Sequence, residues 1–510
     1  MNRALERFQP GLALLAAGGT LAVLLVIYQL ARNGQLELAL PLLIASVGAL
    51  VLLRFPWAGF ALLVASVPVQ RLGAEGGPLP VTLTQLAVPV AIAGLVIGLA
   101  AGQPRLRGHA LLIPYCALVL VMLASAVRAQ SGSAALAEFA RWAVALAAFW
   151  LALQFVVGSS RRMIAFVTLL ALGGVFEATI GVLQSVLGAG PFQLQSGVSR
   201  AFGTFGKPNS YAGYLEMTLF PAVWLGVWYV AEYWRRLEIY RVARLQGMAA
   251  SREQRLALAR SVLMALLLLG SAAIILGGIV ASLSRGAWLG VAVGALVTAL
   301  LFGRTTRLVT ITAIAAAGAI FLSGQTWLIP EDFRDRISAS VDQVRPFNPA
   351  NVVITDENFA AAERFAHWQA GLGMFQDYPL LGIGAGNFNT HYEDYSVRET
   401  FRHSQGHAHN FYIHTLAETG MLGLLAYLTL LGSVMALALR VLLSRYGRGS
   451  LARAVVLGAF GSIVAVAAHN VFEHLHVLNM GIVISLLWAL VIAGHVGWRH
   501  DRLEETQRAA

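Results

Sequence analysis

Long apolar runs alternate with short polar gaps along almost the whole chain. Because about 20 apolar residues in a helix cross the ~30 Å hydrocarbon core of a bilayer, the pattern predicts an all-α polytopic membrane protein of about 14 transmembrane helices. We read the first run as a membrane helix, since it is longer than the core of a signal peptide. The predicted spans lie near residues 11–30, 36–53, 56–70 (short), 82–101, 109–127, 135–157, 163–187, 211–232, 261–283, 287–303, 308–323, 411–439, 454–473 and 477–498.

Arginines in the gaps orient these spans. Gaps rich in arginine, such as 235–260 and 440–453, alternate with gaps that hold few basic residues. Since basic loops stay in the cytoplasm, both termini are expected there, and the polar segments 188–210 and 324–409 are expected outside. The predicted parts of the chain are N-terminal transmembrane helices (1–187), a transmembrane core with arginine-bearing outer segments (188–323), a periplasmic loop subdomain (324–410), and C-terminal transmembrane helices with a short cytoplasmic tail (411–510).

Composition agrees with this interpretation. The 510 residues are 58% hydrophobic and 12% charged, against about 25% charged in an average soluble domain, which excludes a soluble protein. The net charge of +11 is spread over the gaps rather than gathered in a patch, so a nucleic-acid partner is not expected. The lone cysteine, Cys116, excludes disulfides within the chain, and we expect it to be inert packing.

The first candidate for chemistry is the segment Arg200-Ala-Phe-Gly-Thr-Phe-Gly-Lys-Pro-Asn, which runs from an outer gap into a membrane helix. It combines Arg200 and Lys207 with glycines and with Pro208, which is typical of the first residue of a helix. Free amides at such a helix start favour a phosphate. The alternative is that both cations only extend to the membrane interface.

A second candidate is the break around Ser282-Leu-Ser-Arg-Gly. Ser282, Gly286, Gly290 and Gly294 form a stripe of small residues, which permits close helix contact. Arg285 would stand beside this contact at the outer edge. A cation there is costly unless it is paired or faces a polar cavity, which favours a ligand-binding role.

The third candidate is His403-Ser-Gln-Gly-His-Ala-His-Asn, where the long loop meets the next helix. A helix that included His409, Gly420 and Gly423 on one face would direct His409 into the bundle at the outer boundary. A neutral imidazole there suits proton abstraction from a hydroxyl. The alternative is a metal site, disfavoured because no nearby carboxylate or cysteine completes a ligand set. Its candidate ligands are His403, His407, His409 and His414.

Three weaker patterns remain. Residues Asp356 to Asp377 predict an amphipathic helix with Asp356 as N-cap and Phe359, Ala362, Ala366, Gln369 and Gly373 near one stripe. The stretch Gly382-Ile-Gly-Ala-Gly-Asn-Phe predicts a tight turn rather than a nucleotide loop, because no strand precedes it. Glu138 and Arg141 are spaced to pair on a helix, and Glu177 is a further ionisable group within a predicted span.

Together these residues resemble the O-antigen ligase and O-antigen polymerase family of bacterial inner-membrane, lipid-linked glycan transferases. The resemblance covers roughly residues 195–435. Its motifs are the Arg200 segment, Ser284-Arg-Gly-Ala-Trp, Pro379-Leu-Leu-Gly-Ile-Gly-Ala-Gly-Asn-Phe, and His409-Asn410 followed after nine residues by Gly420-Met-Leu-Gly423. The first half of the chain is similar only in being a series of membrane helices.

The resemblance implies an inverting transfer, without metal or other cofactor, of a glycan from undecaprenyl diphosphate to an acceptor hydroxyl at the periplasmic face. Arg200 and Arg285 would hold the diphosphate, and His409 would orient or deprotonate the acceptor. The acceptor would be lipid A core, a growing glycan or a protein. Lysine at 207 departs from the family pattern. Further residues considered for substrate contact are Lys207, Asn209, Asn410, Arg364, Arg402 and His407.

Two other functions fit the same motifs. A protein O-oligosaccharyltransferase would differ only in its acceptor. A small-anion transporter would have no covalent chemistry, and it should place its ionisable groups near the midplane of the membrane. The outer positions predicted for Arg200, Arg285 and His409 favour the transferase.

Overall fold

The computed structural model describes residues 29, 32, 47–69, 82–102, 106–191, 199–246, 251–322, 347–355 and 358–509. Within these ranges every element of regular secondary structure is a helix, and there is no β-strand. The chain forms two compact units, which we describe separately. The first comprises residues 1–108 with 150–155, and the second comprises 109–149 with 156–510.

The first unit holds a bent helical pair and one candidate span. The apolar helix 47–54 continues into α3 (Ala58–Ser66) and a 3-10 turn (Val67–Val69) after a bend of 119°. The span is α4 (Leu83–Ala100), which starts with a capping box of Thr82 and Gln85. The spans expected near 36–53 and 56–70 are therefore one bent pair in their described parts, and the span expected near 11–30 lies almost wholly outside the described residues.

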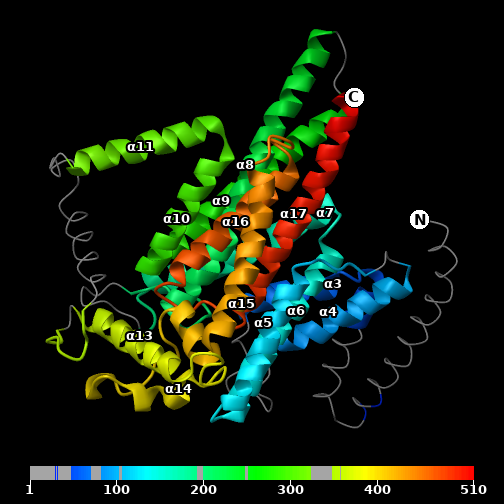
Figure 1. The fold of residues 1–510 in the computed structure, drawn as a ribbon. Coiled ribbons are helices and arrows are strands. Elements are labelled where there is room, and N and C mark those ends of the chain that lie inside the picture. Colours follow the sequence, from blue (N-terminus) through cyan, green and yellow to red (C-terminus); the bar gives the residue numbers. More distant parts are fainter. Residues whose placement is uncertain are drawn as a thin grey trace. The chain divides into compact units, whose positions relative to one another are not determined.

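The second unit holds the remaining helices (Figure 1). They are α5 (Leu112–Ser125), η2 (Ala126–Arg128), α6 (Gly132–Phe155, whose last six residues belong to the first unit), α7 (Ser160–Val186), α8 (Pro208–Leu245), α9 (Arg252–Ala281), α10 (Arg285–Phe302), α11 (Arg304–Leu322), α13 (Phe359–Asp377), α14 (Phe388–His391), η4 (Tyr392–Tyr395), η5 (Glu399–Phe401), α15 (Phe411–Leu442), α16 (Leu451–His469) and α17 (Met480–Ala509).

Nine helices in the described ranges are long and apolar enough to cross a membrane, or ten if the bent pair is one span. The chain is thus an all-α, multi-pass membrane protein, but the expected number of about fourteen is not confirmed. The apolar helix over 112–128 is short. Cys116, expected to be inert packing, is a free thiol that is exposed on the protein.

The small-residue stripe on α10 is a helix contact, as predicted. A Cβ on Gly286 would lie 2.6 Å from the His469 ring of α16, and one on Gly294 would lie 2.7 Å from the carbonyl oxygen of Gly461. A Cβ on Gly290 would meet Ala465 and Glu216. Close approach of α10, α16 and α8 therefore depends on the absence of side chains at these positions.

Helix α15 is broken at Gly420, contrary to the prediction of one continuous helical face through Gly420 and Gly423. Gly420 has φ 62° and ψ −164°, a conformation essentially restricted to glycine. The loop 379–388 packs into the break, with the Met421 amide donating to Pro379 and the Ile383 amide to Ala417. This loop is the tight turn expected from its glycines, since Gly382, Gly384 and Gly386 all have positive φ.

The amphipathic helix of the long loop is α13, and it differs from the prediction at its start and in its buried face. It begins at Phe359 after Asn358, and Asp356 lies outside the described residues. Phe359 is 41% exposed, while the buried stripe runs through Ala362, Ala366 and Met374. The stripe shifts because α13 packs against α15 and the η4 turn, through a cluster that includes Met374 and Tyr392.

Candidate functional site

The candidate site lies where several helices of the second unit begin or end. The carbonyl oxygen of Ala281, at the end of α9, accepts from the amide of Ala201, just before α8. The amide of Phe411, at the start of α15, donates to the carbonyls of Asn470 and Glu473 in the turn between α16 and α17. These backbone bonds bring the Arg200 segment beside the α9–α10 break, and the His409 segment beside the 470–479 turn.

His409 stands just before α15 rather than on it, which corrects the predicted helical face. Its φ is 51°, in the left-handed region, so the backbone turns sharply there before the helix starts. Asn410 is the N-cap, and its side-chain oxygen accepts the Ile413 amide at 3.0 Å. Asn410 therefore caps α15, as asparagine commonly does at this position.

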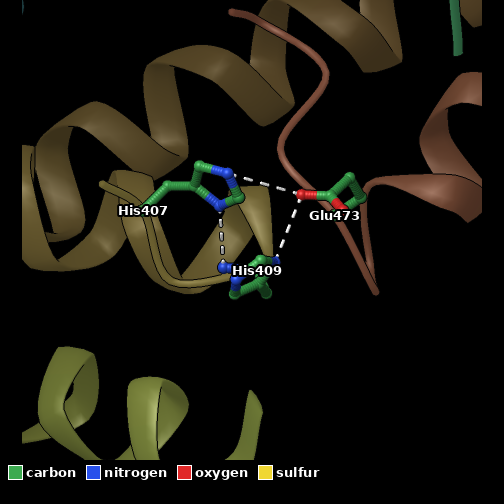
Figure 2. Close-up of side chains that lie close together, drawn as sticks. All are labelled: His407, His409 and Glu473. Carbon is green, nitrogen blue, oxygen red and sulfur yellow. Dashed lines mark hydrogen bonds and ion pairs between the residues drawn. The ribbon is translucent and has the colours of Figure 1, made fainter. Parts of the chain in front are cut away.

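The side chain of Glu473 faces both His407 and His409 (Figure 2). Its Oε1 atom is 3.4 Å from Nδ1 of His409 and 3.6 Å from Nε2 of His407. The side chains of Glu473, His407 and His409 are only 6%, 13% and 16% exposed. No carboxylate lies near these histidines in the sequence. In the structure Glu473 supplies one, from a turn that is distant along the chain.

These three side chains are close enough to share a cation, but the hydrogen bonds of His407 argue against one. Its Nδ1 accepts the amide of His409 at 3.2 Å, and burial lowers the pKa of His407 to about 3. A neutral ring that accepts at Nδ1 carries its proton on Nε2, the atom that faces Glu473. Nε2 then has no lone pair to offer a metal, so the arrangement favours hydrogen bonding.

Glu473 is suited to remain ionised. Burial by itself would raise its pKa, but His409, His407 and His469 more than reverse this effect and hold the pKa well below its usual range. The second oxygen, Oε2, accepts from the side-chain amide of Asn209 at 2.5 Å, and Oε1 also accepts the His474 amide at 3.1 Å. A carboxylate with this many donors is stabilised in its charged form.

Arg200 is joined to the same cluster. Its Nε donates to the carbonyl oxygen of Ser282 at 2.9 Å, and one terminal nitrogen donates to Asn209 at 3.3 Å. Because Asn209 also donates to Glu473, a continuous chain of polar contacts runs from Arg200 to His409.

Three arginines share this region. Burial lowers the pKa of Arg200, and the nearby charges of Arg364 and Arg285 lower it further, while Glu473 acts in the opposite direction. Arg364, on α13, also interacts electrostatically with Arg285, the first residue of α10. Three guanidinium groups within range of one another repel, which is the arrangement that a multiply charged anion neutralises.

Helix α7 holds the Arg200 segment in place. Both carboxylate oxygens of Glu177 accept from Thr204, at 3.0 Å from the amide and 2.7 Å from the hydroxyl. The side chain of Gln184 accepts the Gly203 amide at 2.8 Å and donates to the Gly203 carbonyl at 3.0 Å. Glu177 therefore braces the turn that carries Arg200, a role that its sequence position did not indicate.

Other predicted residues lie apart or serve other contacts. Lys207 is exposed and acts electrostatically on His407. Arg402 is ion-paired with Glu393 and Glu399 on the loop. His414 faces Glu418 at 3.5 Å, and His403 is exposed, so neither joins His407 and His409. Glu138 and Arg141 pair as expected, and Glu138 also accepts from Trp142.

Sequence reasoning missed the turn between α16 and α17. The predicted spans leave residues 474–476 as a simple gap, although Asn470-Val-Phe-Glu-His-Leu-His places one acidic residue and two histidines between apolar runs. It also missed the buried pair beneath the site, in which Nδ1 of His469 lies 2.6 Å from Oε1 of Glu216. Charged residues at such positions are the available signal, since they are costly inside a membrane protein.

Comparison with known families adds one finding. Residues 270–428 match the family model described as O-Antigen ligase, about a third of the chain. The matched stretch includes Arg285, Arg364 and His409, whereas Arg200, Asn209 and Glu473 lie outside it. No curated protein matches the chain.

Proposed function

We propose that this membrane protein transfers a glycan from undecaprenyl diphosphate to an acceptor hydroxyl, with inversion and without a metal. The match of residues 270–428 to the O-antigen ligase family model supports this proposal. The observation that carries the proposal is the grouping of Arg200, Arg285 and Arg364 beside the contacts of His409 and Glu473. We further propose that this site faces the periplasm, in the inner membrane of a bacterium.

In the proposed reaction, the acceptor oxygen attacks the anomeric carbon of the donor sugar. The bond between that carbon and the phosphate oxygen breaks, and undecaprenyl diphosphate leaves with the electron pair. Arginines suit the leaving group, because guanidinium contacts with phosphate are bidentate and meet the charge where it develops. Attack from the face opposite the leaving group inverts the anomeric centre.

His409 is the proposed base. Its Nδ1 faces Glu473, and its Nε2 has no hydrogen-bond partner among the described residues. With the proton on Nδ1, Nε2 carries the lone pair that accepts the acceptor's hydroxyl proton. His409 belongs to the same polar chain as Arg200, so base and diphosphate site lie in one network.

Replacement of Arg285 tests the diphosphate role. Arg285→Ala is expected to abolish glycan transfer by purified protein and to weaken binding of undecaprenyl diphosphate, while expression and membrane insertion stay normal. Arg304→Ala is the matched control, because Arg304 likewise begins a helix, α11, but is exposed and follows the far end of α10. Retained transfer by Arg285→Ala would contradict the assignment.

One assay identifies the acceptor class and also tests whether transfer requires a metal. Purified protein is given lipid-linked donor and, in parallel, lipid A core, a second lipid-linked glycan or a protein, each with and without a chelator. We expect transfer to one acceptor class that persists with the chelator. No transfer to any acceptor, together with movement of a small anion in vesicles, would favour a transporter instead.

A further inference from the structure

We propose that Glu473 is the positioning residue of the site, holding His409 and Asn209 in the arrangement that transfer requires. This inference rests on the proposed function and extends it to the turn between α16 and α17, outside the matched family stretch.

The two oxygens of Glu473 serve two parts of the site. Oε2 accepts from Asn209, whose own oxygen accepts from Arg200. Oε1 faces Nδ1 of His409 at 3.4 Å and Nε2 of His407 at 3.6 Å. One carboxylate therefore fixes the distance between the arginine that is proposed to hold the diphosphate and the histidine that is proposed to take the proton.

Glu473 also selects the tautomer of His409. A carboxylate accepts only, so the ring atom that faces it is favoured as the protonated one, which here is Nδ1. The orienting partner of a catalytic or metal-bound histidine is commonly a carboxylate at one nitrogen, with the reactive lone pair on the other. A glutamine at 473 presents either an oxygen or an amide N–H to the ring, so this preference is lost.

The burial of Glu473 shows that its position is specified by its partners. Its side chain is 6% exposed, and a buried carboxylate is strongly unfavourable unless it is paired and hydrogen-bonded. The groups that face it or His409 are His407 beside α15, His367 on α13, the His474 amide and Asn209 on α8. These groups come from four different segments of the fold.

Steady-state kinetics with Glu473→Gln, Glu473→Asp and Asn209→Ala test the role. Glu473→Gln is expected to lower kcat roughly 100-fold, the scale of a lost general base, and to leave the KM for the donor within about threefold. Glu473→Asp should recover part of the loss, because it keeps the acceptor-only carboxylate. The matched control is Glu393→Gln, which removes an exposed loop carboxylate paired with Arg402.

The combination of variants reports the coupling. Since Asn209 and Glu473 belong to one network, the effect of the double variant should be clearly smaller than the product of the single effects. An unchanged kcat in Glu473→Gln would overturn the proposal. Equal losses of kcat, donor binding and melting temperature in both Glu473 variants would also overturn it, because they would indicate a purely structural role.

A measurement without glycan transfer separates this inference from the proposed function. In protein labelled with 15N-histidine, the signals that disappear in His409→Gln identify the ring, and their shifts report which nitrogen is protonated. We expect Nδ1 to carry the proton in the wild type, and a mixed or inverted tautomer in Glu473→Gln, even if no transfer is detected. An unchanged tautomer, or histidine signals that shift when a chelator removes a bound metal, would overturn the positioning role.

Discussion

Arg453 illustrates how a single cation can be structural in this protein. It is only 8% exposed, near the start of α16. Its two terminal nitrogens donate to the carbonyls of Val441, Leu442 and Ser444 at the end of α15, and to Leu301 near the end of α10. The last carbonyls of a helix have no partner within it, so one guanidinium completes two helix ends.

Replacement of Arg453 should therefore affect stability rather than chemistry. Arg453→Ala leaves several buried carbonyls unpaired, and we expect a loss of about 3 kcal/mol in unfolding free energy, on the scale of hydrogen bonds to a charged group. Thermal melting in detergent measures the change, with exposed Arg448→Ala as the control. A melting temperature equal to that of the control would contradict this role.

At the scale of elements, the break in α15 determines where the loop 379–388 can lie. Both oxygens of Glu418, two residues before the break, accept loop amides, from Gly386 at 2.8 Å and Phe388 at 2.9 Å. The loop thereby connects the break to α14 and to the packing of α13. The position of the loop therefore depends on Gly420 as much as on the hydrogen bonds that Glu418 accepts.

Gly420→Ala should disturb this element strongly. The new Cβ would lie 2.3 Å from the carbonyl carbon of Leu380, at a backbone conformation that alanine avoids. We expect a cost of roughly 1–3 kcal/mol or more from strain alone, seen as a lower melting temperature and reduced donor binding. Gly432→Ala in the same helix has open space around it, and its stability should stay equal or rise by up to about 1 kcal/mol. Equal effects of the two variants would contradict the account.

At the scale of the whole molecule, the alternation of helix directions places the candidate site at the ends opposite the arginine-rich turns. The starts of α8, α10 and α15, the end of α9 and the turn that follows α16 meet at the site through the contacts described above. The positive-inside pattern assigns the opposite ends to the cytoplasm. The predicted orientation therefore applies to the second unit, with its candidate site on the periplasmic side and its arginine-rich turns on the cytoplasmic side.

Accessibility labelling tests this orientation. In a Cys116→Ser background, Gln405→Cys near the site should react with a membrane-impermeant maleimide in intact spheroplasts. Arg448→Cys, in the turn between α15 and α16, should react only after permeabilisation. Both positions are exposed on the protein. Labelling of both from the same side would contradict the predicted topology.

Much of the helical organisation was readable from the chain. Apolar runs predicted α4, α6, α7 and α10 to within a few residues, because a membrane span must be long, apolar and internally hydrogen-bonded. Helix α8 continues well beyond its predicted end, to Leu245, and α9 begins well before its predicted start, at Arg252. The number of spans was not readable. Runs that look alike in hydropathy include a helix bent by 119° and the short helix over 112–128. Bends depend on what packs against a segment, and hydropathy does not record this.

The candidate site, like the fold, could be predicted only in part from the sequence. Sequence by itself singled out Arg200, Arg285 and His409, because cations and an imidazole at the edges of apolar runs are costly and their types suggest a chemistry. Only the tertiary structure brought Glu473 to His409, placed Arg364 among the arginines and showed Asn410 as a helix cap. Local pattern determines which segments become helices. Which side chains meet at their ends is decided by contacts between residues far apart in sequence, such as Asn209 and Glu473.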